Sequence, residues 1–124
     1  MKLKYKDIKP LRDKMLTEQD HRCALCEDTI DPREAVLDHD HKTGRIRRVL
    51  HRGCNALEGK IVNNMARNRL TMERLNTFAQ NLVTYMDHNY EDIVHPTYLD
   101  GEERLQRAKL RRKKKLGSIG KKEV

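Results

Sequence analysis

The chain has 124 residues, of which 27 are Lys or Arg and 19 are Asp or Glu, giving a net charge of +8. This length predicts one compact domain with at most a short appendage. No run of roughly 18 apolar residues is present, so we expect no membrane span. Residues 1–10 lack the apolar core of a signal peptide, so we expect an intracellular protein. Because thiols stay reduced inside cells, we expect the three cysteines to be metal ligands or buried thiols rather than a disulfide framework.

Hydrophobic residues make up 36% of the chain and charged residues 37%, and the sequence has no Trp and a single Phe. A chain of this size buries only a modest fraction of its surface, so this composition predicts a thin core. A bound metal, a partner subunit or both would supply the missing stability.

The first predicted elements are a helix and a β-hairpin. Residues 9–20 have the short apolar stripe of a helix. Residues 35–37 are typical of a strand and residues 46–50 of its return, joined by a turn in which Gly44 supplies the unusual backbone angle. A second tight turn is expected at residues 51–54.

Two helices and a basic tail follow the hairpin. The first helix begins at Asn55, a good helix starter, and is interrupted early by Gly59. Thr71 caps a longer amphipathic helix that packs either on the chain's own core or on a partner subunit. Its apolar residues recur every three or four positions: Met72, Leu75, Ala79, Leu82, Val83 and Met86. From Asp100 onward we expect a basic helix or a disordered tail.

Positive charge is concentrated in the C-terminal part. Residues 104–122 hold ten Lys or Arg and no acid, so the rest of the chain has 27 − 10 = 17 basic residues against 19 acidic ones, a net charge of −2. Cationic tails most often bind polyanions, above all nucleic acid, although a solvated, disordered terminus has the same composition. The expected DNA contacts in the tail are Arg111, Arg112, Lys113, Lys114 and Lys115.

Two pairs of potential zinc ligands share the same spacing. Cys23-x-x-Cys26 and His51-x-x-Cys54 each place two donors on one tight turn, and 24 residues separate the pairs, enough for the hairpin to return to its start. Three thiolates and one imidazole form a common structural zinc site in which no position is left for substrate. The alternatives are incidental cysteines or a redox pair, but no thioredoxin-like βαβ pattern surrounds CALC.

The stretch LDHDH, residues 37–41, crowds acids and imidazoles together, which suits either phosphodiester hydrolysis or a merely polar turn. Hydrolysis needs a general base near pH 7, a hard cation and donors for the phosphate. His39 would be the base, and Asp38 and Asn55 would be oxygen ligands of Mg²⁺, for which Mn²⁺ can substitute. The expected phosphate contacts are Arg45, Arg47, Arg48 and Arg52.

The strand geometry constrains this assignment. Regular alternation would place Asp38 and His39 on opposite faces, so the strand must end or bend there for both to serve one phosphate. For the same reason Arg47 and Arg48 cannot both face one groove if the return strand is regular.

The run LDHDHKTGRIRRVLHRGCNALEG, with CALC ahead of it, resembles the phage recombination endonuclease VII family, which belongs to the HNH, or ββα-metal, nucleases. A weaker match continues through LVTYMDHNYEDIVHPTYL, so the resemblance covers residues 10–99. For the site it implies these roles: Asp38 and Asn55 bind the catalytic Mg²⁺, His39 is the general base, His41 contacts or polarises the phosphate, and Glu58 assists near the metal.

The resemblance also implies substrate and assembly. The family typically cleaves branched DNA such as four-way junctions as an intertwined homodimer, with residues 60–90 supplying the exchanged helices. A phage-encoded enzyme would act in the host cytoplasm. The expected fold is α+β and mostly helical, with a zinc-stapled ββα-metal core and long flanking helices in a helix-swapped dimer. Its expected parts are an N-terminal helix at 1–22, the nuclease core at 23–66, a dimerisation helix at 67–95 and a basic DNA-binding tail at 96–124.

The sequence departs from the family in two places. His51 stands where the family usually has the first cysteine of the second zinc pair, and the part after residue 99 is short and basic, which bears on junction specificity more than on nuclease activity. An HNH endonuclease that nicks ordinary duplex DNA would share every catalytic residue. A zinc-stabilised DNA-binding protein without activity would not require the Asp-His-Asn set.

Overall fold

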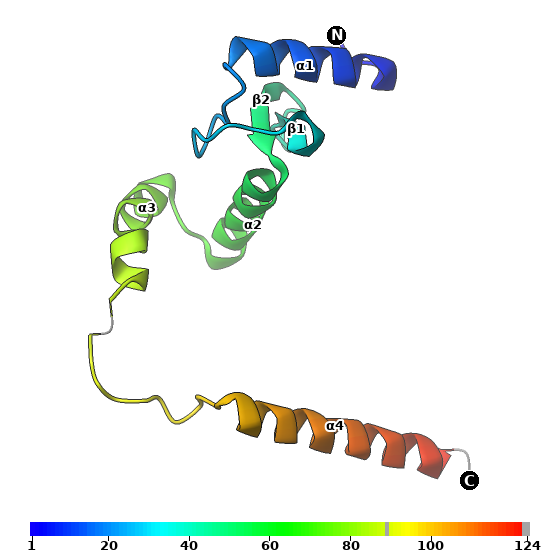
Figure 1. Ribbon diagram of the computed structural model, residues 1–124, viewed down its shortest axis with the longest axis vertical. Coiled ribbons are helices and arrows are strands. Elements are labelled where there is room, and N and C mark those ends of the chain that lie inside the picture. Colours follow the sequence, from blue (N-terminus) through cyan, green and yellow to red (C-terminus); the bar gives the residue numbers. More distant parts are fainter. Residues whose placement is uncertain (89, 123–124) are drawn as a thin grey trace. The chain divides into compact units, whose positions relative to one another are not determined.

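The computed structural model describes residues 1–88 and 90–122 (Figure 1). Residue 89 of the predicted dimerisation segment and residues 123–124 of the predicted tail therefore lie outside the described residues. The chain divides into two compact units, residues 1–80 and residues 81–124. In the part of the chain that the structure describes, no helix is both long and apolar enough to cross a membrane.

The fold is α+β and mostly helical, as expected. A short 3-10 turn, η1, precedes the first helix, and a second, η2, precedes the hairpin, whose strands are followed by three helices. The elements are η1 (Tyr5–Asp7), α1 (Ile8–Glu18), η2 (Pro32–Glu34), β1 (Ala35–His39), β2 (Ile46–His51), α2 (Arg52–Asn68), α3 (Met72–Met86) and α4 (Gly101–Lys122).

The core lies where α1 packs against the hairpin. Leu16 of α1, Val49 of β2 and Ile30 of the intervening loop are almost completely buried, as is the thiol-bearing Cys23. Only six apolar residues are buried among those the structure describes, so the predicted thin core is confirmed. With so little buried surface, a metal ion held by the cysteines would contribute a large share of the stability.

A β-bulge shapes the hairpin. Leu37 pairs with Val49, but His39 pairs with Ile46, so three steps along β2 match two steps along β1. The extra residue falls among the arginines of β2 and breaks the regular alternation. The register therefore shifts between Leu37 and His39, and the extra residue belongs to β2. Asp38 is buried and His39 is exposed.

The hairpin turn is closed by Asp40. Its carboxylate accepts the backbone N–H groups of Lys42 at 2.7 Å and Thr43 at 3.2 Å. These two hydrogen bonds lower the pKa of Asp40. Gly44 adopts the predicted left-handed conformation, with φ of +74°, and its N–H donates to the Asp40 carbonyl. Asp40 is thus a turn-forming residue.

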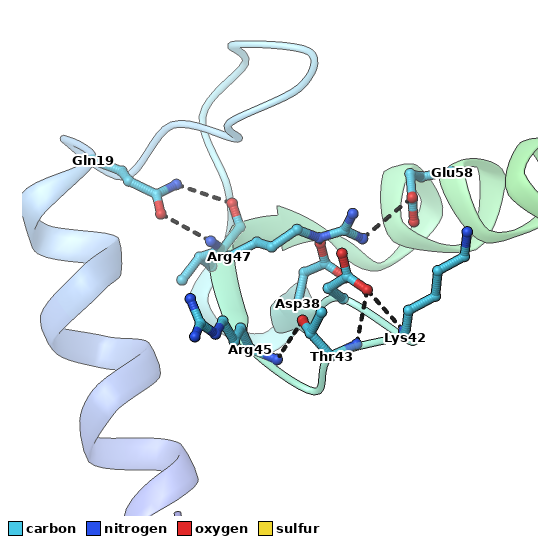
Figure 2. A network of polar contacts seen from close by, with 9 residues as sticks. Gln19, Asp38, Lys42, Thr43, Arg45, Arg47 and Glu58 are labelled. Carbon is cyan, nitrogen blue, oxygen red and sulfur yellow. Dashed lines mark hydrogen bonds and ion pairs between the residues drawn. The ribbon is translucent and has the colours of Figure 1, made fainter. Parts of the chain in front are cut away.

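Gln19, just beyond α1, pairs with the outer edge of β2. The Val49 N–H donates to Oε1 of Gln19 at 2.8 Å, and Nε2 of Gln19 donates to the Val49 carbonyl at 2.9 Å (Figure 2). A side-chain amide carries one donor and one acceptor group, like a peptide group. Gln19 therefore ties α1 to the hairpin by satisfying both backbone groups of one strand residue.

Several predicted boundaries were wrong. The helix expected from Asn55 begins at Arg52, so the predicted tight turn at 51–54 is mostly the first turn of α2. Gly59 does not interrupt α2, because a glycine lowers helix propensity without removing the backbone hydrogen bond. Thr71 does cap α3, since its Oγ1 accepts the Arg74 N–H at 3.2 Å. The described part of the tail is helical.

Candidate functional site

The four predicted zinc ligands converge. The sulfur atoms of Cys23, Cys26 and Cys54 and a ring nitrogen of His51 all lie within 4.8 Å of one another. Tetrahedral zinc with bonds of about 2.0–2.3 Å separates its donor atoms by roughly 3.5–4 Å, so small side-chain adjustments suffice. The Cys₃His cluster fits a structural zinc ion.

The hydrogen bonds of His51 select which ring nitrogen faces the thiols. Nε2 lies 3.0 Å from the Thr29 carbonyl, which only an N–H can approach, so Nε2 carries the proton. Nδ1 lies 3.2 Å from Sγ of Cys26 and 3.9 Å from Sγ of Cys54. In the neutral imidazole Nδ1 therefore offers its lone pair to the cluster, and a backbone carbonyl holds the ring in orientation, as is usual for zinc-binding histidines.

The cluster shifts the pKa values of its members in opposite directions. Burial disfavours the Cys23 thiolate, but hydrogen bonds from the backbone N–H groups of Cys26 and His51 outweigh burial and lower the pKa of Cys23 to about 6. Burial and the neighbouring sulfur atoms raise the pKa of Cys54 to about 11. The hydrogen bond to Cys23, followed by that to Thr29, raises the pKa of His51. A cation is needed to bring all four donors into their ligating state.

A second cluster lies between the hairpin and α2. Nε of Arg47 donates to Oδ2 of Asp38 at 2.7 Å, and Nη2 of Arg47 lies 3.2 Å from Oε1 of Glu58 (Figure 2). The Asp38 side chain is only 7% exposed. The hydrogen bond to Asp38 raises the pKa of Arg47. One guanidinium thus joins a strand carboxylate to a helix carboxylate.

Glu58 has one oxygen that is not satisfied. Its Oε2 is buried and has no hydrogen-bond partner among the described residues. A buried carboxylate oxygen without a partner is costly, so such an atom in a site suggests a missing ligand. Asn55 lies three residues earlier in α2, on the same face of the helix as Glu58. Helix α2 therefore presents the oxygen-bearing side chains of Asn55 and Glu58 on one face.

The candidate base follows Asp38 in the chain and opens to solvent. His39 is exposed at the end of β1, directly after the buried Asp38. The rings of His39 and His41 are 5.0 Å apart between centroids. Two imidazoles and a buried carboxylate thus occupy the end of one strand and the start of the turn. The bulge lies opposite this strand end, among the arginines of β2.

The predicted phosphate contacts divide into two groups. Arg47 is engaged with Asp38 and Glu58, whereas Arg45, Arg48 and Arg52 are exposed. Figure 2 shows Arg45 and Arg47 extending in opposite directions from the hairpin, Arg47 towards Glu58 and Arg45 towards α1. The tail contacts all lie on α4, in the second unit, and are exposed: Arg111, Arg112, Lys113, Lys114 and Lys115.

The family model for recombination endonuclease VII matches residues 1–89, which is more than two thirds of the chain. The chain belongs to the recombination endonuclease VII family. Membership indicates a nuclease that acts on DNA. The match includes the zinc cluster, the hairpin and both helices that follow it, and it ends before α4 begins at Gly101.

Two contributors to the site were not predicted from sequence. Arg47 was expected to contact phosphate, and its role as a bridge between acids was missed, although opposite charges on paired strands are a recognised signal. Thr29, which orients His51 through a backbone carbonyl, leaves no signal in the sequence, because any residue can supply that group.

Proposed function

We propose that this member of the recombination endonuclease VII family is a Mg²⁺-dependent DNA endonuclease that hydrolyses phosphodiester bonds. One observation carries the proposal: the buried Asp38 is followed directly by the exposed His39, and Asp38 is linked through Arg47 to Glu58 on the neighbouring helix. An acid held in place next to a solvent-exposed imidazole suits a reaction in which water is deprotonated beside a cation.

The oxygen donors of this region fit a hard divalent cation. Asp38 offers a carboxylate, Asn55 offers an amide oxygen, and Glu58 has a buried oxygen without a partner. Mg²⁺ prefers one or two such protein oxygens and completes its shell with water and substrate. When bound, the ion would supply positive charge to the phosphate and the leaving oxygen. Asp38 and Asn55 would hold it, with Glu58 close by.

His39 would act as the general base. Its ring is exposed, so a water molecule and a DNA phosphate can reach it, and a neutral imidazole accepts a proton near neutral pH. His41, with its ring 5.0 Å from that of His39, would contact the phosphate. Arg47 would hold the carboxylates of Asp38 and Glu58 at a fixed separation, which prevents their mutual repulsion from opening the site.

The zinc ion would have a structural role. Its ligands come from the loop after α1, from the end of β2 and from the first turn of α2. Bound zinc would fix the base of the hairpin to the start of the helix that carries Asn55 and Glu58. All four ligand positions are filled by protein, which favours stabilisation over catalysis.

Binding of DNA would rely on two sets of cations. Three exposed arginines lie on the hairpin or at the start of α2 and would contact phosphates near the cut: Arg45, Arg48 and Arg52. Helix α4 has 22 residues and at 1.5 Å per residue spans roughly 33 Å, close to one turn of duplex DNA. Its Lys and Arg side chains would grip the backbone without reading sequence or shape.

We further propose a homodimer that cleaves branched DNA such as four-way junctions. The support is the apolar stripe of α3, of whose described residues none is buried in the single chain. Val83 is 77% exposed, Met72 73% and Phe78 56%. Exposed apolar residues in such a row are typical of an interface between subunits. Two paired active sites would suit two cuts at a junction.

The deciding experiment compares a labelled four-way junction with a linear duplex of the same sequence, in Mg²⁺ and at several salt concentrations. Preferential paired cuts near the junction would support the junction endonuclease. Equal nicking of both substrates would instead make the protein a general duplex nickase. Tight binding of both without any cutting would reduce the site to DNA binding.

His39→Ala provides the catalytic control. This variant should lose cleavage by about 10²- to 10⁴-fold while retaining its fold and its DNA affinity, because His39 is exposed and is assigned only proton transfer. If His39→Ala unfolds the protein, or cleaves as fast as the unaltered chain, the assignment of the base is wrong.

A further inference from the structure

A groove of about 950 Å³ lies between the N-terminal residues and the hairpin. Lys2, Tyr5 and Ile8 line one side, and His39, Arg45 and Ile46 line the other. Among the described residues that line it, none is acidic. Both walls belong to the unit formed by residues 1–80. The groove therefore includes the candidate base His39 and has a cation on each wall, Lys2 on one and Arg45 on the other.

Lys2 and Arg45 are the Lys and Arg side chains among the described residues that line the groove, and most of the other lining residues are apolar. The first nine residues contain four lysines and a single acid, Asp7. Arg45 adds a cation from the hairpin, and Figure 2 shows its side chain extending away from the Asp38–Arg47–Glu58 cluster. Unlike Arg47, Arg45 forms no ion pair among the described residues, so its charge is available to a ligand. A long anion is the ligand that such a surface favours.

Tyr5 adds an aromatic surface to these cations. It is 94% exposed, so the folded unit gains little from it. An exposed aromatic ring beside lysines and arginines is the combination with which proteins hold single nucleic-acid strands, because bases stack on the ring while cations track the backbone. A small anion such as free phosphate would make no use of Tyr5.

We propose that this groove binds the stretch of DNA strand that adjoins the scissile phosphate, with Lys2 and Arg45 at backbone phosphates and Tyr5 against a base. The inference rests on the proposed function, because it assumes that the phosphate to be cut lies at His39. A strand whose phosphate is at His39 must continue over the surface next to that residue, and the groove is lined by His39 itself. Its volume is near the upper end of the roughly 300–1,000 Å³ of small-ligand sites, ample for a nucleotide.

The test measures DNA affinity in a non-cleaving background. Fluorescence anisotropy with labelled DNA, on the His39→Ala protein, gives Kd as a function of salt for added Tyr5→Ala, Tyr5→Phe, Lys2→Ala or Arg45→Ala changes. We expect Tyr5→Ala to raise Kd at least about fivefold. Tyr5→Phe should leave Kd at the parent value, because stacking needs the ring and not the hydroxyl. Loss of Lys2 or Arg45 should lower the slope of log Kd against log salt by about 0.7–0.9 each.

Lys14→Ala is the matched control. It removes a lysine of helix α1 that does not line the groove and is paired with Glu18 across 4.0 Å in solvent. Its Kd and salt slope should equal those of the parent. Thermal melting of each variant establishes that the fold is unchanged, which the exposure of Tyr5 makes the expected result.

Three outcomes would overturn the inference. If the unaltered chain cleaves DNA but Tyr5→Ala and Lys2→Ala bind like their parent, the groove is not used while the nuclease assignment stands. If Lys14→Ala weakens binding as much as Lys2→Ala, the grip is diffuse and the groove has no special part in it. If the parent itself binds no DNA, both the groove and the proposed function fall.

Discussion

Arg47 donates its Nε–H to Oδ2 of Asp38 across 2.7 Å, from one strand of the hairpin to the other. The Asp38 side chain is 7% exposed and that of Arg47 is 39% exposed, so the carboxylate of the pair is buried and the guanidinium is partly open to solvent. A buried carboxylate that loses its cation keeps its desolvation cost without compensation. The stability of the site therefore depends on Arg47 more than on the other hairpin arginines.

Replacement of Arg47 by Met should lower the free energy of unfolding by about 2 kcal/mol. Breaking a buried pair costs roughly 3–5 kcal/mol, and the partial exposure of Arg47 reduces that figure. Arg48→Met removes the neighbouring exposed arginine and should change the free energy by less than about 0.5 kcal/mol. Urea unfolding followed by circular dichroism measures both. Equal effects for the two variants would contradict the special role of the Asp38 pair.

Loss of a zinc ligand should unfold the first unit. Cys54→Ala removes one donor of the Cys₃His cluster, and a structural zinc site contributes on the order of 10 kcal/mol, as much as the whole stability of a small domain. We expect Cys54→Ala to lose bound zinc and cooperative melting. His51→Cys should retain one zinc per chain, because a thiolate can replace the imidazole.

Zinc content by elemental analysis and thermal melting provide the two readouts. His95→Ala, which removes a histidine outside the cluster, is the control and should leave both unchanged. If Cys54→Ala melts at the wild-type temperature, the cluster is not a structural zinc site.

Acidification should release zinc and destabilise the fold. The pKa of Cys23 is about 6 in the folded chain against an ordinary 9.0. A lowered pKa stabilises the folded state fully above the unfolded pKa of 9.0, and this contribution is lost as the pH falls through about 6. Protons also compete with zinc for the thiolates, so both effects have the same sign. A zinc-sensitive dye should detect little release at pH 8 and progressive release below pH 6. Equal release at pH 8 and pH 5 would refute this expectation.

A charge on the apolar face of α3 should separate the subunits. Val83 is 77% exposed in the single chain, so Val83→Asp costs an isolated subunit little but would bury an unpaired carboxylate in a dimer interface. Asn81→Asp places the same charge on the opposite face of α3 and serves as the control. Analytical ultracentrifugation should give a monomer for Val83→Asp and a dimer for Asn81→Asp and the unaltered chain. A wild-type chain that sediments as a monomer would remove the proposed dimer.

Local patterns in the sequence predicted much of the fold. The hairpin was predicted from apolar runs around Gly44, and the cap of α3 from Thr71, because both depend on residues within a few positions of one another. The convergence of Cys23, Cys26, His51 and Cys54 was predicted from spacing, since a shared ion is the simplest reason for two matched pairs. These features require no knowledge of how distant segments pack.

The features that were missed depend on register and on distant segments. The bulge in β2 reorients Arg47, and no residue type in IRRVLH marks the position of the extra residue. Helix α2 starts at Arg52, which places Cys54 inside the first helical turn. There Cys54 lies close to Cys23 and Cys26, and this contact between distant segments is not visible in local helix propensity. The groove between Tyr5 and Arg45 joins segments 40 residues apart, which no local pattern relates.

The pairing of Gln19 with Val49 limits how the protein can assemble. A hairpin of two strands has two open edges, and an open edge is a template on which a strand of another molecule can add. The Gln19 side chain occupies both the N–H and the carbonyl of Val49, as a neighbouring strand would. The side chain blocks strand addition at the middle of β2, so self-association through this edge of the sheet is disfavoured.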